Sequence, residues 1–254
     1  MRRLIAFPCE GETLVGSLDE AEGTTGLLIV SGGNEIRAGA HRGMATLAAQ
    51  VAAAGFPVLR FDRRGVGDST GENRGFRASA PDLAAAVAAF RAEAGVTRVI
   101  GFGNCDAASA LALFGRAAGL ERVILANPWV VEPADDLPPP AAIRARYAER
   151  LRDPAAWRRL ARGRVSLAKL ARGLARLARP AATAQSDVLA AVTAWGETAT
   201  VILATRDATA LAYAEAARGG ERSAPVRIDT ASHSFADAGE ALAATIMETI
   251  TSEQ

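Results

Sequence analysis

The residues Gly103-Asn104-Cys105-Asp106-Ala107 place a thiol between an apolar stretch and a run of small residues. The apolar stretch 99-VIGF-102 predicts a buried strand, and 106-DAASALALFG-115 predicts a helix that begins directly after the cysteine. A nucleophile at such a turn needs small neighbours, because the backbone is strained and the side chain must be exposed. The dipole at a helix N-terminus also favours a thiolate. Cys105 is therefore the candidate nucleophile, with a buried apolar thiol as the alternative.

Two later residues complete a candidate triad in the order nucleophile, acid, histidine. Asp207 follows a predicted strand by two residues, and His233 lies between a predicted strand and the last predicted helix. The imidazole would take the proton of the thiol, and the carboxylate would hold the imidazole in the required tautomer. The chain contains only two histidines, so one at this place favours catalysis over a surface loop role. A helix N-cap is the alternative interpretation of Asp207, and Asp135 and Asp136 are the alternative acids.

Backbone N–H groups beside the nucleophile predict an oxyanion hole, which stabilises the charge that develops on a carbonyl oxygen during acyl transfer. One donor is the N–H of Asp106, the residue after the nucleophile. The second is expected from the loop 31-SGGNEIRAGAHRG-43, where Gly33 lets the backbone approach a substrate closely. Asn34 and Asn104 adjoin Gly33 and the nucleophile, and we expect them to bind the substrate. Together these residues predict an enzyme that acts on an acyl group.

These residues require a sheet whose strands end near one edge. Short apolar runs alternate with longer helical patterns, which is typical of crossover units in a parallel sheet, and the first two runs are close enough to pair antiparallel. Unbroken apolar runs such as GLLIV and VILA suit strands that helices cover on both faces. The fold class is therefore α/β, with a mostly parallel eight-stranded sheet and helices on both faces. The sequence predicts strands over 2–8, 12–18, 26–32, 57–62, 97–103, 121–127, 199–205 and 225–231. It predicts helices over about 41–54, 79–94, 105–118 and 237–251, and one more helix between the last two strands.

Composition and charge exclude several classes of protein. The chain has 254 residues, 50% of them hydrophobic, and its net charge of +1 argues against a nucleic-acid-binding protein that is basic throughout. The apolar N-terminal run breaks at Pro8, so it predicts no signal peptide, and no apolar stretch is long enough to span a membrane. Two distant cysteines predict a reduced, cytoplasmic protein. The sequence has neither a metal-ligand cluster nor a dinucleotide fingerprint, so we expect no metal and no cofactor.

An insertion over residues 132–186 separates two parts of the predicted core, 1–131 and 187–254. It includes the proline-rich 137-LPPP-140, and between residues 141 and 180 it holds twelve basic residues against two acidic ones. This segment carries +10, so the remainder of a chain with net charge +1 carries −9. Leucines at spacings of three and four predict an amphipathic helical cap with outward arginines. We expect the cap to cover the site and attract an anionic small-molecule substrate or an anionic membrane, with a solvated helical face as the alternative.

Four segments together resemble the exosortase A system-associated hydrolase 1 family of α/β hydrolases. They are SGGNEIRAGAHRG, GFPVLRFDRRGVGDSTGE, GNCDAASA and ANPWV, and they cover most of residues 26–130. The resemblance implies an α/β-hydrolase fold and a cytoplasmic hydrolase encoded beside genes for exopolysaccharide synthesis and exosortase sorting. It also implies a site role for His41 and Arg42, although a solvent-facing histidine at a helix start fits the same position.

A cysteine nucleophile narrows the expected substrates, because a thiolate leaves more readily than an alkoxide. A tetrahedral adduct with a poor leaving group would expel Cys105 again, so thioesters, lactones and aryl or enol esters are expected rather than amides. Two other functions fit the same residues. Acyl transfer to a sugar hydroxyl would use the same triad, and a non-catalytic binding protein would use the basic cap and keep Cys105 as a structural or redox-sensing thiol. The ordered triad counts against the binding protein, and the sequence leaves the oligomeric state open.

Overall fold

The computed structural model describes residues 1–130, 186–218 and 224–252. Its centre is an eight-stranded sheet in the order β1-β2-β4-β3-β5-β6-β7-β8. β1 pairs antiparallel with β2, β2 pairs antiparallel with β4, and the remaining pairs are parallel. The expected α/β class and mostly parallel sheet are thereby confirmed. The strands are β1 (Arg2–Cys9), β2 (Glu12–Asp19), β3 (Thr25–Val30), β4 (Val58–Phe61), β5 (Arg98–Asn104), β6 (Arg122–Ala126), β7 (Ala199–Ala204) and β8 (Val226–Ile228).

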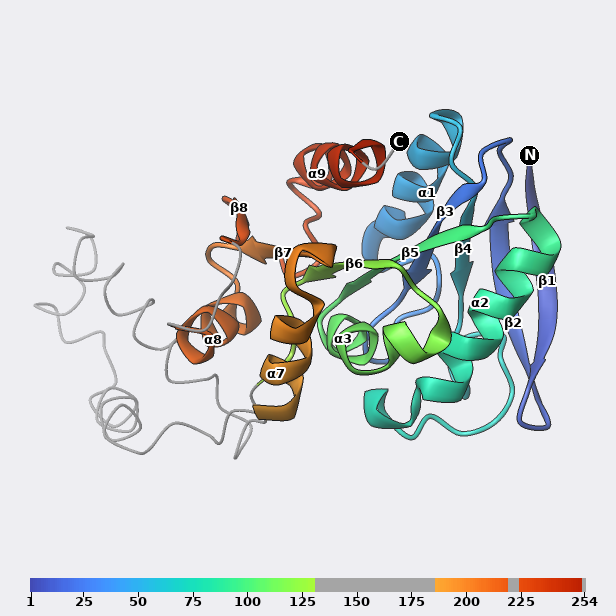
Figure 1. Ribbon diagram of the computed structural model, residues 1–254, viewed down its shortest axis with the longest axis horizontal. Coiled ribbons are helices and arrows are strands. Elements are labelled where there is room, and N and C mark those ends of the chain that lie inside the picture. The colour runs from blue at the N-terminus through green and yellow to red at the C-terminus, as the bar shows by residue number, and fades with distance from the viewer. Residues whose placement is uncertain (131–185, 219–223, 253–254) are drawn as a thin grey trace, which may run out of the picture.

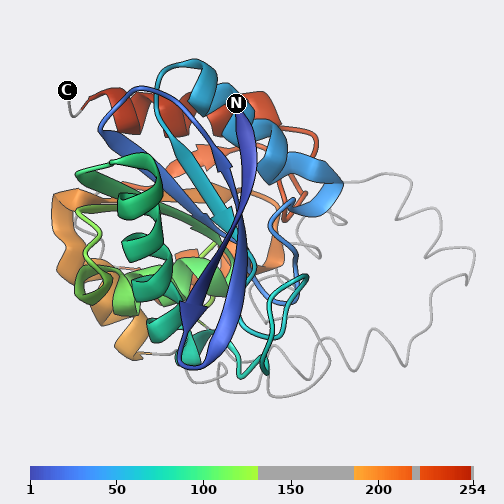
Figure 2. The ribbon, with the colours of Figure 1, turned by 90° about the vertical axis from the view of Figure 1, so that its right-hand side faces the viewer.

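The helices are α1 (Gly43–Ala53), α2 (Ala80–Ala94), α3 (Asp106–Ala118), α7 (Ser186–Trp195), α8 (Ala208–Ala216) and α9 (Gly239–Thr251). They cover both faces of the sheet, with α1 and α9 on one face and α2, α3, α7 and α8 on the other (Figures 1 and 2). In β3, Leu28 and Val30 pack toward the α2 and α3 side, whereas Leu27 and Ile29 pack toward α1 and α9. Both sets are buried, which explains why this strand is an unbroken apolar run.

The sequence prediction lacks α7, because the predicted pattern resumes after the insertion only at residue 199. Val188, Val192 and Trp195 are buried at spacings of four and three, and α7 packs against α3. The indole N–H of Trp195 donates to the carbonyl oxygen of Ala112 at 2.9 Å, and the Arg116 guanidinium lies 4.3 Å from the Trp195 ring centroid. Within the described part of the chain, no helix combines the length and the apolar character needed to cross a membrane.

The last strand and the insertion differ from the prediction in other ways. β8 ends at Ile228 rather than near residue 231, because Thr230 begins a loop. The Thr230 hydroxyl accepts the N–H of Ser232 at 2.9 Å and also hydrogen bonds the Asp237 carboxylate. The predicted cap, 132–186, lies outside the described residues except for Ser186, where α7 begins.

The register of the parallel strands brings their carboxyl ends to one edge of the sheet. Gly103 of β5 is opposite Val30 of β3, and Asn104 of β5 is opposite Ala126 of β6. Ala204 near the end of β7 is opposite Ile228, the last residue of β8. The loops that follow these strands therefore converge, as ligand-binding loops do in open α/β sheets.

Candidate active site

Cys105 lies at the turn between β5 and α3, with φ of 62° and ψ of −127°. Positive φ is uncommon and strained for a residue with a side chain. The backbone of neighbouring segments holds the turn, because the Cys105 N–H donates to Ala126 O at 3.0 Å and the Trp129 N–H donates to Cys105 O at 3.2 Å. The side chain is only partly buried. A strained turn that leaves a thiol accessible is the geometry of a nucleophile elbow.

Close backbone approach explains the small residues around this turn. A Cβ added to Gly103 would lie 2.9 Å from the carbonyl carbon of Ala107. A Cβ added to Gly32 would lie 2.7 Å from Asn104 O and 3.4 Å from the Cβ of Cys105. The loop after β3 and the start of α3 therefore both press against the elbow, and larger residues would deform it.

His233 and Asp207 meet beyond the ends of β7 and β8. Nδ1 of His233 lies 3.1 Å from Oδ1 of Asp207. The other carboxylate oxygen, Oδ2, accepts the N–H groups of Thr209 at 2.9 Å and Ala210 at 3.0 Å, so Asp207 is also the N-cap of α8. The Asp207 side chain is 9% exposed and that of His233 is 40% exposed. The helix therefore fixes the carboxylate, and the carboxylate fixes the more accessible imidazole.

Neighbouring groups shift the pKa values of both His233 and Asp207. Hydrogen bonds with Asp207, and then with Cys105, raise the pKa of His233 to about 10, although burial opposes the charged form. Burial by itself would raise the pKa of Asp207, but hydrogen bonds from His233 and from the Ala210 N–H outweigh it and lower that pKa. Cys105, His233 and Asp207 thus interact in a row, and the imidazolium form is favoured through neutral pH.

Two buried asparagines hold the loop that carries His233. Nδ2 of Asn104 donates to the backbone oxygen of His233 at 3.0 Å, and Nδ2 of Asn127 reaches the same oxygen at 3.2 Å. Asn127 Nδ2 also reaches Oδ1 of Asn104 at 3.1 Å, and Asn127 Oδ1 accepts the N–H of Ala204 at 2.9 Å. Asn127 therefore joins the end of β5, the end of β7 and the His233 loop. The amide of Asn104, expected to bind substrate, is directed at protein atoms in this structure.

The predicted oxyanion donors are differently engaged. The Gly33 N–H donates to Oδ1 of Asp106 at 2.6 Å, so a side-chain carboxylate occupies this donor. Nη2 of Arg63 lies 3.3 Å from Oδ2 of the same carboxylate and donates to Gly33 O at 2.8 Å. The backbone N–H of Asp106 is the first of α3, where N–H groups have no acceptor within the helix. The Asp106 N–H therefore has no partner within its own helix.

The remaining predicted residues lie apart from the triad or outside the described residues. Asn34 is exposed, and its Oδ1 accepts a hydrogen bond of 2.8 Å from the amide of an asparagine on the loop after β4. His41 and Arg42 are exposed residues with φ of 51° and 61°, directly before α1. Within the described residues, no hydrogen bond or ion pair joins them to the triad. Asp135 and Asp136, the alternative acids, fall outside the described residues.

Sequence analysis did not single out Asn127 or Arg63. Each directly follows or nearly follows the end of a parallel strand, β6 for Asn127 and β4 for Arg63. Cys105 was singled out because it follows the end of a parallel strand, and the same criterion applies to both of these residues. Their direction, however, depends on which loop each side chain meets, and that follows only from the assembled sheet.

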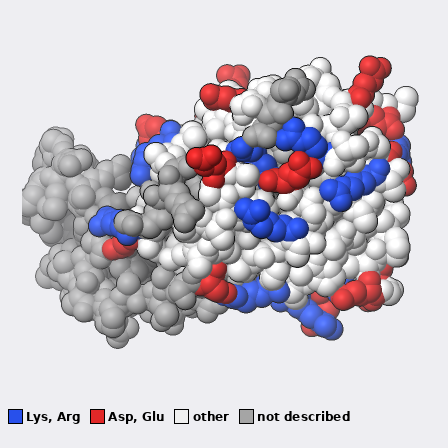
Figure 3. Space-filling view, viewed as in Figure 1, with Lys and Arg blue, Asp and Glu red and all other residues white. Residues whose placement is uncertain are grey.

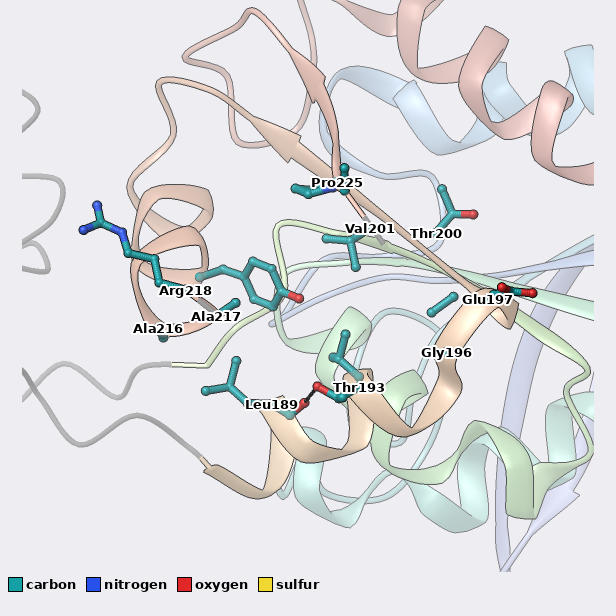
Figure 4. Close-up of a pocket in the computed structure, with 14 residues that line it drawn as sticks. Leu189, Thr193, Gly196, Glu197, Thr200, Val201, Ala216, Ala217, Arg218 and Pro225 are labelled. Atoms are coloured by element: carbon teal, nitrogen blue, oxygen red, sulfur yellow. Dashed lines mark hydrogen bonds between the residues drawn. The ribbon is translucent and has the colours of Figure 1, made fainter. Parts of the chain in front are cut away.

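A cavity of about 330 Å³ lies between α7, β7 and α8 (Figure 4). Leu189 and Thr193 of α7, Val201 of β7 and Tyr213 of α8 help to line it. It adjoins the beginning of β7, whereas Asp207 follows the end of that strand. Cavity and triad therefore lie toward opposite ends of β7.

The second cysteine has a different environment. Cys9 is 4% exposed, and burial together with the Asp82 carboxylate raises its thiol pKa to about 11. Its Sγ lies 3.5 Å from Oδ1 of Asp82. A thiol that is buried and held protonated is a poor nucleophile. Across the described residues, no three His, Cys, Asp or Glu side chains gather as metal ligands would.

Comparisons with known proteins agree with this fold. A family model described as "Alpha/beta hydrolase family" matches residues 27–245. Among solved structures, the alpha/beta hydrolase GrgF from Penicillium sp. sh18 is 18% identical, with a TM-score of 0.66 and coverage of 98% of both chains. The thioesterase domain from the curacin biosynthetic pathway is 14% identical, with a TM-score of 0.63 and coverage of 97% of this chain and 99% of that one.

The Pyrococcus furiosus esterase Pf2001 is likewise 14% identical, with a TM-score of 0.65 and coverage of 99% of this chain and 90% of that one. No curated protein matches the chain. At these identities the solved structures share the fold, and the chemistry has to be argued from the site.

Proposed function

Because this chain belongs to the alpha/beta hydrolase family, we propose that it hydrolyses activated acyl esters, thioesters or lactones through Cys105, His233 and Asp207. One observation carries the proposal. The imidazole of His233 is held by Asp207 at 3.1 Å, and a hydrogen bond with the Cys105 thiol is the second cause that raises its pKa. This arrangement joins a nucleophile, a proton carrier and an orienting carboxylate.

In the proposed cycle the sulfur of Cys105 attacks the acyl carbon, and the carbonyl electrons move onto oxygen. Backbone N–H groups of Asp106 and Gly33 would hold that oxyanion. The bond to the leaving group then breaks, and the imidazolium of His233 supplies its proton. Water next attacks the acyl-thioenzyme while His233 takes the water proton. Collapse of this second adduct releases the carboxylic acid and restores the thiolate beside the imidazolium.

The choice of activated acyl donors follows from the nucleophile. In the first adduct, the thiolate competes with the substrate's leaving group, and the weaker base departs. Thiols, phenols and enols compete well with the sulfur of Cys105, whereas amines do not. Thioesters, aryl or enol esters and strained lactones are therefore proposed as substrates, and peptides are not.

The biological context proposed for this enzyme rests on the sequence resemblance alone. We propose a place for this hydrolase beside exopolysaccharide synthesis and exosortase sorting, on the four matching segments. A reducing, cytoplasmic location is proposed from the free cysteines, because a thiol nucleophile must stay reduced.

The proposal is tested with a panel of acyl thioesters and aryl esters. Cys105→Ala is expected to lower kcat by roughly 10³-fold or more, because every step passes through the thiolate. Iodoacetamide should alkylate Cys105 and abolish turnover, with the modified cysteine identified by peptide mass spectrometry.

Cys9→Ala is the matched control and should retain turnover, because Cys9 is buried and held protonated. Turnover of the best substrate that survives complete alkylation of Cys105, or its replacement by alanine, would overturn the mechanism.

A further inference from the structure

The carboxylate of Asp106 occupies a donor that acyl transfer needs. Its Oδ1 accepts the Gly33 N–H at 2.6 Å. An N–H already bound to a carboxylate offers little to a developing oxyanion, and the fixed negative charge repels that oxyanion. If the proposed reaction takes place at this elbow, the Asp106 side chain must leave Gly33 during turnover.

If Asp106 moved away, the buried guanidinium of Arg63 would lose its carboxylate partner. The Arg63 side chain is 4% exposed, and its ion pair among the described residues is with Asp106, at 3.3 Å. The neighbouring Asp62 carboxylate does not replace it, because that group is fully buried and engaged by Arg37 and by the Asp68 N–H. Removing one partner of a buried ion pair is strongly unfavourable unless another anion takes its place.

The anion site lies beside the nucleophile and opens to solvent. A Cβ on Gly32 would be 2.9 Å from Oδ1 of Asp106 and 3.4 Å from the Cβ of Cys105, so Gly32 lies against both the carboxylate and the nucleophile. The Asp106 side chain is 17% exposed and Gly33 is exposed. A ligand that displaces Asp106 can therefore reach Arg63 from the side of the thiol.

We propose that Asp106 is a displaceable stand-in for an anionic group of the substrate, and that Arg63 selects acyl donors carrying a carboxylate near the scissile carbonyl. This inference rests on the proposed function and adds its substrate class. The substrate carboxylate takes over the guanidinium of Arg63, Asp106 swings toward solvent, and the Gly33 N–H becomes free for the carbonyl oxygen. A neutral acyl donor cannot compensate Arg63 and therefore competes poorly with Asp106.

The test compares glutaryl and pentanoyl thioesters of N-acetylcysteamine, which have equally long acyl chains and differ in a terminal carboxylate. Wild-type enzyme is expected to favour the glutaryl thioester in kcat/KM by roughly tenfold or more, the usual size of a charge-assisted hydrogen bond. Arg63→Gln should bring the ratio close to one, whereas Arg63→Lys should keep a preference. Asp106→Ala should raise kcat/KM for the pentanoyl thioester several-fold, because no carboxylate then blocks Gly33.

Arg74→Gln is the matched control, because Arg74 is a 70% exposed arginine on the same loop after β4, and it should leave the ratio unchanged. Equal wild-type kcat/KM values for the two thioesters overturn the inference, even if Arg63→Gln fails to fold. So does an Asp106→Ala variant in which both values fall together, since Asp106 would then support the elbow rather than block it.

A binding measurement separates this inference from the proposed function. Glutarate should bind Cys105→Ala more tightly than pentanoate in calorimetry, and Arg63→Gln in that background should abolish the difference. Arg63-dependent glutarate binding without turnover of any thioester would leave the anion site standing and overturn the proposed function. Turnover of thioesters without a preference for the glutaryl thioester or for glutarate would overturn the anion site and leave the proposed function standing.

Discussion

The two oxygens of the Asp207 carboxylate make different contacts. Its Oδ2 caps α8 through two backbone N–H groups, and its Oδ1 faces the imidazole of His233. The N-cap and triad interpretations of this residue are therefore compatible rather than exclusive. The hydrogen bonds at the N-terminus of α8 restrain the carboxylate of Asp207. A restrained carboxylate holds the imidazole of His233 in one tautomer. The sequence can name such a residue, but only the packed loops show that both contacts are made at once.

The raised pKa of His233 predicts how the thiol reacts at different pH values. Asp207, and then Cys105, raise that pKa to about 10, so the imidazolium persists through neutral pH and favours a thiolate beside it. Alkylation by iodoacetamide should therefore fall less steeply toward low pH in wild type than in His233→Ala. His233→Ala should slow alkylation most at low pH, because the variant loses the imidazolium charge that stabilises a thiolate beside it.

Cys9 serves as the internal reference in this measurement, because its thiol pKa of about 11 keeps it unreactive in both proteins. Superimposable pH profiles for wild type and His233→Ala would show that the imidazole does not act on the thiol. Asp207→Asn should give an intermediate profile, because it removes the largest support of the imidazolium but keeps the ring.

At the scale of elements, the carboxyl ends of the parallel strands account for what the sequence could predict. Apolar runs identified seven strands closely, and the rule that functional residues follow strand ends singled out Cys105, Asp207 and His233 as candidates. The eighth strand was predicted too long, because hydrogen bonds of Thr230 with Ser232 and Asp237 begin the loop early. Side-chain polarity alone does not reveal such contacts.

Side-chain direction is what sequence patterns could not predict. Asp106 was expected to contribute its backbone N–H, yet its carboxylate reaches back to the Gly33 N–H. Asn127 lies in the left-handed region with φ of 44° and turns its amide toward the His233 loop. Both directions depend on contacts between loops far apart in the chain, and these form only when the sheet is assembled.

Asn127→Asp tests whether the asparagine pair positions the histidine loop. The variant keeps the shape and tolerates positive φ, but it replaces a donor with an oxygen that faces Asn104 Oδ1 and the His233 carbonyl oxygen. The loop should shift, because buried acceptors left without a donor cost about 1–3 kcal/mol each. We expect kcat to fall roughly tenfold with KM little changed, and Cys105 alkylation to move toward the His233→Ala pH profile.

Ser109→Ala is the matched control for that variant. Ser109 is also fully buried near the elbow, and its hydroxyl donates to Trp129 O at 2.7 Å without touching the His233 loop. Its loss should lower the melting temperature without altering the pH profile. A profile that changes equally in both variants, or in neither, would assign Asn127 a structural role alone.

At the scale of the molecule, charge is divided unevenly along the chain. Residues 141–180 carry +10 and the remainder −9, within a net charge of +1. On the face seen in Figure 3, acidic and basic side chains of the described residues are interspersed. Ion pairs such as Arg3 with Glu20, at 2.8 Å, and Arg98 with Glu121, at 3.1 Å, neutralise one another locally. The uncompensated positive charge of the sequence therefore belongs to residues 141–180, outside the described residues.

We propose that this basic segment recruits an anionic substrate or an anionic membrane, and charge reversal tests it. Arg158→Glu, Arg159→Glu and Arg162→Glu together should raise KM for the glutaryl thioester and leave a neutral aryl ester unaffected if the segment attracts substrate. They should abolish sedimentation with anionic vesicles if it docks on membrane, where each basic residue adds roughly 1 kcal/mol.

Salt distinguishes this long-range recruitment from the buried Arg63 contact. Exposed charges are screened within about 8 Å at physiological ionic strength, whereas a buried pair is screened much less. The KM effect of the triple variant should therefore disappear at high salt, while the glutaryl preference that depends on Arg63 should persist. If charge reversal changes neither KM nor sedimentation, at low or high salt, the arginines of this segment recruit neither substrate nor membrane. The pattern of leucines would then be the feature of this segment that matters.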